Sequence, residues 1–303
     1  MNTQIKKQIA SLKKEKNAVI LAHYYAPSDV QEVADYVGDS FYLAKIAKAS
    51  EADLIVFCGV NFMGESAKIL NPSKKVIMPD ISADCPMAHM VAEGKIAEMR
   101  EKYDDLAVVC YINSTAELKC QSDVCVTSSN AVKIVRALPN KNIFFIPDRN
   151  LARFVAEQVP EKNIIANEGC CPIHAKISAR ELLVEKEAHP AAKVLTHPEC
   201  EPEILELSDF IGSTAEIIDY AKSNGDGEYI ICTEDGVEAK LALDTPGSKF
   251  YFPKTRPVCV DMKLNTLKKL LHALESEEDE VKVSDEVREG ALLPLDRMLE
   301  IAK

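Results

Sequence analysis

Short hydrophobic runs alternate along this chain with longer segments whose polarity pattern is helical. Runs such as Val19–Leu21 and Val108–Tyr111 are rich in strand-forming residues and too short for a helix, so they predict buried strands. Strands that alternate with helices are typical of βαβ units, in which the strands of a sheet lie parallel. The pattern therefore predicts an α/β protein built on parallel sheets.

The predicted strands recur at a regular interval. The first strand of each stretch ends at or near His23, Tyr111 and His197, which are 88 and 86 positions apart. This period indicates three copies of one α/β/α sandwich unit, each with a small parallel sheet. The second and third strands of the three copies are expected at Asp53–Val60, Asn142–Pro147 and Glu228–Thr233, and at Lys75–Met78, Asn163–Ala166 and Lys249–Phe252.

The length of the chain agrees with several units. A chain of 303 residues is longer than one hydrophobic core usually serves. We predict α/β/α repeats at residues 1–85, 86–171 and 172–259, arranged with pseudo-threefold symmetry around a central site. Residues 260–303 are expected to form a helical tail with no chemistry of its own.

A cysteine follows the third predicted strand of every unit. Cys85, Cys171 and Cys259 are 86 and 88 positions apart. Ligands of parallel sheets bind beyond the carboxyl ends of the strands, so three such ends around one axis would bring these thiols together. Three thiolates are one fewer than a closed structural site takes, which leaves a metal position open for Lewis-acid chemistry. Cys170 and His174 stay open as alternative ligands, although we expect His174 to face substrate.

Three other cysteines are expected to be packing residues rather than ligands. Cys58, Cys110 and Cys232 lie within hydrophobic strands, where a free cysteine packs like a small hydrophobic residue. No C-x-x-C pair occurs, so the local signature of zinc ribbons and ferredoxins is absent from the sequence.

Charged side chains stand at two predicted strand ends. Glu199 follows His197 by two positions, and a carboxylate in a partly dry pocket can act as a general base while a histidine moves protons. Asp148 and Arg149 are expected to form a local ion pair.

Hydroxyl side chains open several predicted helices: Ser40, Ser128, Ser213 and Thr214. At these positions they would act as N-caps, and helix N-termini also bind carboxylates and phosphates. No G-x-G-x-x-G or Walker-type loop is present, which counts against dinucleotide or ATP binding.

The net charge of −12 argues against a nucleic-acid partner, since phosphate binding needs a basic surface. No apolar run has the roughly 18–20 residues of a membrane span, and the N-terminus lacks the apolar core of a signal peptide. We therefore expect a cytoplasmic protein with no membrane association.

In order and spacing, a set of segments over nearly the whole chain resembles the quinolinate synthase family. The segments are His23-Tyr24-Tyr25, Gly38-Asp39-Ser40, Asp84-Cys85-Pro86, Tyr111-Ile112-Asn113, Thr127–Ala131, Gly169–His174, His197–Cys200, Gly212-Ser213-Thr214 and Cys259. The resemblance implies three α/β/α domains in pseudo-threefold array and a 4Fe-4S cluster held by three cysteines. It also implies condensation of iminoaspartate with dihydroxyacetone phosphate to quinolinate, with loss of phosphate and two waters.

Residue by residue, the resemblance implies that Cys85, Cys171 and Cys259 hold the cluster, and that its open iron acts as Lewis acid. The family's Gly-x-Cys-x-(Val/Ile)-His pattern favours Cys171 over Cys170. Catalytic roles fall to Glu199, His197, Tyr25 and Tyr111, and substrate binding to His23, Ser40, Asn113, Ser128, His174, Ser213 and Thr214. Some relatives carry a C-x-x-C-x-x-C element that ends at the third ligand; it is absent here, since Arg256 stands three residues before Cys259.

Alternative classes remain open from the sequence. One is a radical iron–sulfur enzyme of the diphthamide-synthesis type, against which the His-Pro-Glu and Thr-Ser-Ser-Asn-Ala segments argue. The others are a non-catalytic small-anion binding protein and a zinc hydrolase. From the resemblance we also expect a partner, an aspartate-oxidising enzyme that supplies iminoaspartate.

Overall fold

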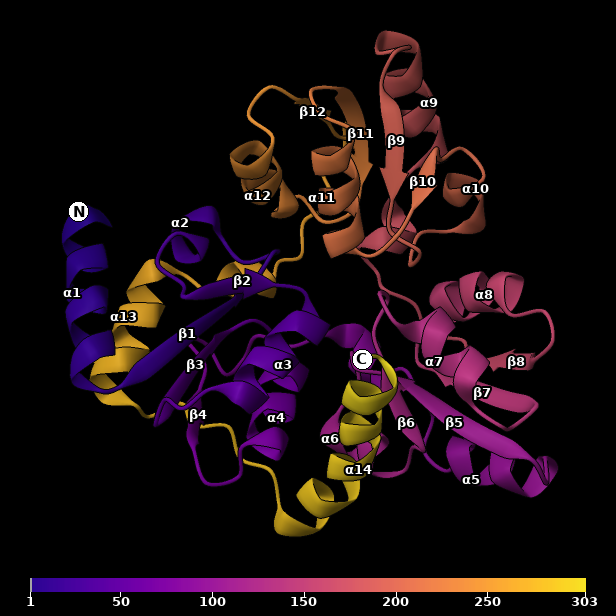
Figure 1. The fold of residues 1–303 in the computed structure, drawn as a ribbon, viewed down its shortest axis with the longest axis horizontal. Coiled ribbons are helices and arrows are strands. Elements are labelled where there is room, and N and C mark those ends of the chain that lie inside the picture. The colour runs from indigo at the N-terminus through magenta and orange to yellow at the C-terminus, as the bar shows by residue number, and fades with distance from the viewer. Residues whose placement is uncertain (1) are drawn as a thin grey trace.

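The computed structural model describes residues 2–303 and contains three separate four-stranded sheets. All strand pairs within these sheets are parallel, and the strand orders are β2-β1-β3-β4, β6-β5-β7-β8 and β10-β9-β11-β12. Each sheet carries helices on its faces and forms one lobe of a three-lobed molecule (Figure 1). The predicted α/β class with three repeated units is confirmed.

The first unit surrounds β1, whose residues Ala18–Ala22 pair in register with Leu54–Cys58 of β3. Its helices cover both faces of the sheet, and hydrophobic side chains fill both sides of β1. The elements are α1 (Asn2–Glu15), β1 (Ala18–His23), α2 (Ser28–Gln31), β2 (Tyr36–Gly38), α3 (Ser40–Ala49), β3 (Leu54–Cys58), α4 (Asn61–Leu70), β4 (Lys75–Ile77) and the 3-10 helix η1 (Pro86–His89).

The second unit repeats this arrangement around β5, and its sheet shares one hydrophobic cluster with the first unit. The elements are α5 (Lys95–Lys102), β5 (Leu106–Tyr111), α6 (Ala116–Cys120), β6 (Val124–Val126), α7 (Ala131–Ala137), β7 (Asn142–Ile146), α8 (Arg149–Gln158), β8 (Asn163–Ala166) and η2 (His174–Lys176).

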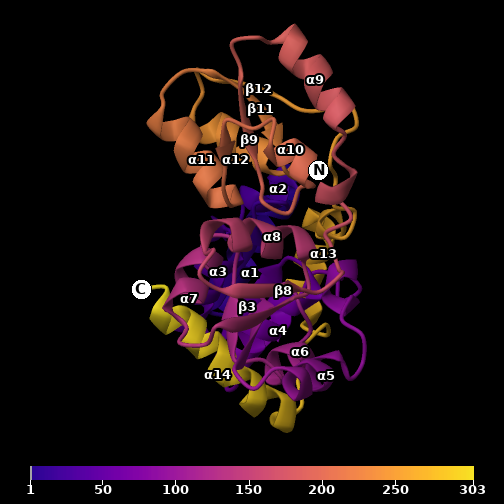
Figure 2. The same ribbon diagram turned by 90° about the vertical axis from the view of Figure 1, so that its right-hand side faces the viewer.

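The third unit has two small hydrophobic clusters that are separate from those of the other units. Accordingly it stands apart as its own lobe in both views (Figures 1 and 2). The elements are α9 (Ala179–Ala188), β9 (Lys193–Thr196), α10 (Pro202–Leu205), β10 (Phe210–Ile211), α11 (Thr214–Ser223), β11 (Glu228–Cys232), α12 (Val237–Asp244), β12 (Lys249–Tyr251) and η3 (Met262–Leu264).

Each sheet contains one strand more than the three that the sequence predicts. The additional strands are the edge strands β2, β6 and β10, which have 3, 3 and 2 residues. Length alone does not explain why they were missed, since β4 and β12 also have 3 residues and lie where the sequence predicts strands. The other nine strands lie where the hydrophobic runs predict them, within a few residues at the ends.

The C-terminal segment packs on two of the units. Helix α13 (Leu267–Ser276) lies against α1 and β3, and α14 (Asp285–Ile301) lies against α6, β6 and α4. Figure 1 shows α14 in yellow between the first and second lobes. No helix within residues 2–303 combines the length and the apolar composition that crossing a membrane requires.

The packing of α14 predicts how two leucine substitutions change the free energy of unfolding. Leu295 is fully buried on this helix, whereas Leu293 is 55% exposed two residues earlier. Leu295→Ala should lower the free energy of unfolding by about 2–5 kcal/mol because it leaves a cavity, and Leu293→Ala by no more than about 0.5 kcal/mol. Equal urea midpoints for the two variants, measured by circular dichroism, would show that α14 does not stabilise the fold.

Candidate active site

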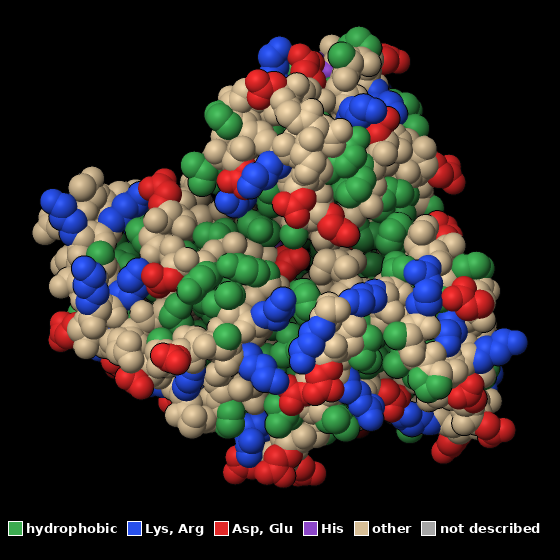
Figure 3. Space-filling view, viewed as in Figure 1, with side chains coloured by type: hydrophobic (Ala, Val, Ile, Leu, Met, Phe, Trp, Pro, Cys, Tyr) green, Lys and Arg blue, Asp and Glu red, His purple; other side chains and the backbone are tan. Residues whose placement is uncertain are grey.

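The carboxyl ends of the three central strands lead into one cavity of about 380 Å³. The last residues of β1 and β5, His23 and Tyr111, and His197 directly after β9 line its wall, and the later loops of each unit bring the three cysteines. On the face drawn in Figure 3, hydrophobic side chains gather around the point where the three lobes meet. Contributions from all three units make this a shared site.

Of the fourteen site residues expected from the sequence, Ser213 alone does not line this cavity within residues 2–303. The Ser213 hydroxyl accepts the N–H of Glu216 at 3.3 Å, and the Glu216 carboxylate accepts the Ser213 N–H at 2.7 Å. This reciprocal pair is a capping box at the start of α11. Ser213 is fully buried, so the structure gives it a capping role.

The three cysteines that end the repeats face the cavity together. Burial, assisted by the charges of Glu199 and Cys259, raises the pKa of Cys85 to about 12, and burial raises that of Cys259 to about 11. The pKa of Cys171 also lies well above its usual value, through burial and then Glu199 and Cys85. These thiols would stay protonated at neutral pH unless a metal supplied positive charge, because metal binding displaces the proton from a thiol.

Cys170 occupies a different environment from its neighbour. It does not line the cavity, and it lies beside the guanidinium of Arg149. The expected ion pair between Asp148 and Arg149 is wrong: Arg149 binds Glu201 at 2.5 Å. Asp148 is instead fully buried and accepts the N–H groups of Leu151 and Cys171, at 2.7 and 2.9 Å.

Two histidines occupy equivalent places in the first and third units. The Nδ1 atom of His23 accepts the N–H of Tyr25 at 3.2 Å, and Nδ1 of His197 accepts the N–H of Glu199 at 3.3 Å. Burial lowers the pKa of each histidine to about 3, so both are neutral at pH 7. A neutral ring that accepts at Nδ1 carries its proton on Nε2, and His197 directs this atom at Ser128 Oγ, 3.3 Å away.

Glu199 stands at the centre of the polar groups and is 2% exposed. Its Oε2 lies 2.7 Å from Nδ1 of His174 and 3.9 Å from Nδ1 of His197. Burial by itself would raise the pKa of Glu199, but the two histidines outweigh it and bring the pKa to about 2. Glu199 is therefore ionised, and His174 rather than His197 is its nearest partner.

The two tyrosines of the site keep their protons. Burial, and then the negative charge of Glu199, raises the pKa of both Tyr25 and Tyr111 well above the usual value. The hydroxyl of Tyr25 lies 2.7 Å from Thr214 Oγ1 and 2.8 Å from Thr233 Oγ1. Both phenols can thus donate a hydrogen bond to a ligand oxygen.

Sequence reasoning missed several residues at the cavity. Thr233 joins Tyr25 to Nε2 of His174, which lies 3.0 Å from its hydroxyl. Asp39, and not Ser40, is the N-cap of α3. Lys176 is exposed at the cavity and is the single lysine among the lining residues within 2–303.

Two buried oxygen atoms at the cavity have no hydrogen-bond partner within residues 2–303: Glu199 Oε1 and Asn113 Oδ1. A buried polar atom without a partner costs free energy, so such atoms mark places where a ligand or metal binds. Cys171, His174 and Glu199 also place one ligand atom each within 4.8 Å of one another. The donor set suits a metal, with thiolates as the softest ligands.

A cavity at converging strand ends, with buried acid and base groups of shifted pKa and metal-type ligands, defines an enzyme active site on a three-unit α/β scaffold. The family model described as "Quinolinate synthetase A protein" matches residues 7–300. Proteins named quinolinate synthase are 55% identical in Fusobacterium nucleatum (98% of this chain, 99% of the relative), 51% in Caldicellulosiruptor saccharolyticus (99% and 99%) and 48% in Clostridioides difficile (100% and 100%).

The chain belongs to the quinolinate synthase family and is an enzyme of NAD biosynthesis. This membership confirms the resemblance drawn from the segments. It sets aside the radical enzyme of the diphthamide-synthesis type and the non-catalytic binding protein.

The capping box implies different roles for two neighbouring hydroxyl side chains, Ser213 and Thr214. Ser213→Ala should lower the free energy of unfolding by about 1 kcal/mol, because an N-cap is lost, and leave kcat/KM unchanged within about twofold. Thr214→Val should instead lower kcat/KM, because Thr214 Oγ1 contacts the Tyr25 hydroxyl at 2.7 Å. Steady-state kinetics and thermal unfolding of both variants test this assignment, which a large loss of kcat/KM in Ser213→Ala contradicts.

Proposed function

We propose that this enzyme condenses iminoaspartate with dihydroxyacetone phosphate to quinolinate, with loss of phosphate and two waters, at a 4Fe-4S cluster held by Cys85, Cys171 and Cys259. The proposal rests on one observation. Three thiols from equivalent loops of the three units face one cavity, beside an ionised Glu199 whose Oε1 has no hydrogen-bond partner within residues 2–303. When bound, the cluster would supply an iron with an open position that acts as a Lewis acid on a substrate oxygen.

The residues at the cavity fit such a group. Iron–sulfur clusters take cysteine thiolates, and three of them leave one iron free for substrate. The raised pKa values of Cys85 and Cys259 describe thiols that a cation would deprotonate. The position of Cys170 beside Arg149, away from the cavity, supports Cys171 as the ligand from this loop.

Glu199 is the candidate general base. Its carboxylate is ionised, fully enclosed, and has one oxygen without a partner, so it can take a proton from a substrate carbon during enolisation and dehydration. His174, whose Nδ1 donates to this carboxylate at 2.7 Å, holds it in position. The hydroxyls of Tyr25 and Tyr111 would donate hydrogen bonds to developing oxyanions.

Substrate anions meet hydrogen-bond donors on several sides of the cavity. Helices α3 and α11 begin there, at Ser40 and Thr214, and their N-termini favour a carboxylate or phosphate. His23, Ser128 and Asn113 add polar side chains, and Lys176 adds positive charge. Together they would hold the two substrates at the proximity that a condensation needs.

The cellular setting follows from the same proposal. Iminoaspartate would come from an aspartate-oxidising enzyme as partner, and a cytoplasmic location stays a prediction from the sequence.

The cluster proposal is tested by metal analysis. Protein purified without oxygen should contain close to four iron and four sulfide per chain, as one 4Fe-4S cluster requires. Cys171→Ser should lose the iron, whereas Cys170→Ser should keep it, since only Cys171 lines the cavity. The reverse pattern would assign the ligand to Cys170. About one zinc and no sulfide would favour a mononuclear site at Cys171, His174 and Glu199.

The role of Glu199 is tested separately from the cluster. Glu199→Gln keeps the size of the side chain and removes the base, so it should retain iron and sulfide while quinolinate formation falls by about 10²-fold or more. Product is measured by chromatography under anaerobic conditions. Turnover at the wild-type rate would exclude Glu199 as the base.

A further inference from the structure

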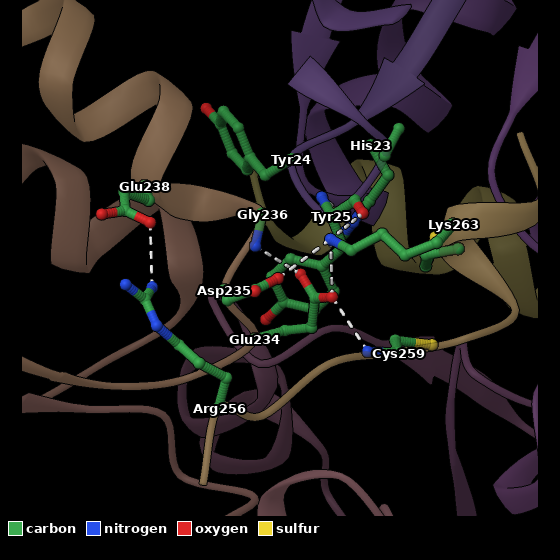
Figure 4. Close-up of polar contacts among 12 residues, drawn as sticks. His23, Tyr24, Tyr25, Glu234, Asp235, Gly236, Glu238, Arg256, Cys259 and Lys263 are labelled. Carbon is green, nitrogen blue, oxygen red and sulfur yellow. Dashed lines mark hydrogen bonds and ion pairs between the residues drawn. The ribbon is translucent and has the colours of Figure 1, made fainter. Parts of the chain in front are cut away.

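A polar contact joins the third unit to the first beside the cavity. The third unit has hydrophobic clusters of its own, and Tyr24 of the first unit packs against one of them. Here the loop after β11, Glu234-Asp235-Gly236, meets the loop after β1, Tyr24-Tyr25 (Figure 4). A Cβ at Gly236 would lie 2.7 Å from Tyr25 Cα and 2.8 Å from Tyr24 O, so only glycine permits this approach.

Glu234 is fully buried and binds the loop of the third cysteine. Its Oε1 accepts the N–H of Cys259 at 2.9 Å, and its Oε2 accepts the N–H of Gly236 at 2.7 Å. One carboxylate thus joins two loops of the third unit at the cavity, the one after β11 and the one after β12. Charge-assisted hydrogen bonds of this kind are stronger than neutral ones.

Lys263 completes the contact and extends it to the first unit. It lies in η3, four residues after Cys259, and its Nζ is 2.8 Å from Glu234 Oε1 and 3.1 Å from Asp235 Oδ1. The same ammonium donates to the carbonyl of Tyr25 at 2.9 Å. Figure 4 shows Lys263 reaching these three partners at once.

Tyr25 is therefore held by the third unit at both ends. Lys263 binds its carbonyl, and Thr233 and Thr214 lie against its hydroxyl. The residue before Glu234 contacts the phenol while Glu234 itself binds the cysteine loop. A shift of either loop would move both Tyr25 and Cys259.

The second unit contains an equivalent carboxylate. Asp148 follows β7 by two residues, as Glu234 follows β11, and it accepts the N–H of Cys171 at 2.9 Å. In the first unit the equivalent position is Val60, and Cys85 N–H binds its own neighbour, Asp84. In both units a buried carboxylate accepts the N–H of the cysteine, which indicates that it positions the cysteine loop.

We propose that Glu234 and Lys263 are a positioning pair that fixes Cys259 and Tyr25 relative to each other. The inference rests on the proposed function only in taking Cys259 as a cluster ligand and Tyr25 as a residue that acts on substrate. Without Lys263, the buried carboxylate of Glu234 loses its ion-pair partner, and so does the partly exposed carboxylate of Asp235. The loop then opens more often, Cys259 becomes more accessible, and Tyr25 loses its position.

The first test uses metal-free protein and needs no activity. Iodoacetamide alkylation, followed by mass spectrometry of each cysteine peptide, reports how often the Cys259 loop opens. Lys263→Met should raise the rate at Cys259 by about fivefold or more and leave Cys85 unchanged. Arg256→Met is the matched control, because Arg256 pairs with Glu238 on the exposed side of the same loop. Arg256→Met should leave both rates unchanged.

The second test uses the reconstituted enzyme. Lys263→Met should lose iron to a chelator faster than wild type, and kcat should fall by about tenfold while KM changes by less than about threefold, since Tyr25 acts on bound substrate. Lys263→Arg should retain more iron and have a higher kcat than Lys263→Met, because it keeps the positive charge. If Lys263→Met does not fold, Glu234→Gln with Lys263→Met removes both charges and gives the same readouts.

The outcomes separate the pair from the cluster. Alkylation of Cys259 at the wild-type rate in Lys263→Met, or in the double variant where only that one folds, would overturn the positioning role, whatever the iron content. Faster alkylation in a protein that never binds iron would uphold the pair and refute the cluster.

Discussion

A parallel sheet presents the residues at its carboxyl edge to a single side, and this molecule uses that constraint three times. None of the three units has a complete site: the first provides His23 and Tyr25, the second Tyr111 and Asn113, and the third His197 and Glu199. The cavity exists only where the edges meet. Everything that fixes the angle between the sheets therefore also fixes the distances among the groups in the site.

The first two units and the third meet this constraint differently. One hydrophobic cluster runs through the first and second units, and α14 packs along both. The third unit has hydrophobic clusters of its own, one of which Tyr24 of the first unit contacts. It also meets the others through polar contacts, including Asn150 with the Glu199 carbonyl at 3.0 Å and Arg149 with Glu201 at 2.5 Å. The strength of a hydrogen bond depends on distance and angle more than the strength of an apolar contact does. The residues that form these polar contacts must therefore hold defined positions.

The sequence predicts the repeat because a buried central strand leaves a local pattern. It also predicts the cavity, because cysteines and histidines follow these strands at a fixed interval. It does not predict that Asp148 and Glu234 accept hydrogen bonds from the cysteine loops. Their partners Cys171 and Cys259 lie 23 and 25 residues further along the chain. A carboxylate near a strand end has the same local sequence whether it pairs with a neighbouring arginine or binds a distant amide. Ser213 shows the converse, since capping and substrate binding both favour serine at a helix start.

Electrostatics explain why the cavity suits a metal and anionic substrates in a chain of net charge −12. Glu199 and Glu234 are buried near it, and one lysine, Lys263, is paired with Glu234. Burial, and then the charge of Glu199, raises the pKa of Asp148 to about 8. The histidines His23 and His197 are neutral, so they contribute N–H groups rather than charge. Helix N-termini and Lys176 supply positive potential, and a metal bound at the thiols would add to it. A cation bound at the three thiols would lie near the carboxylates of Glu199 and Glu234, which would stabilise it.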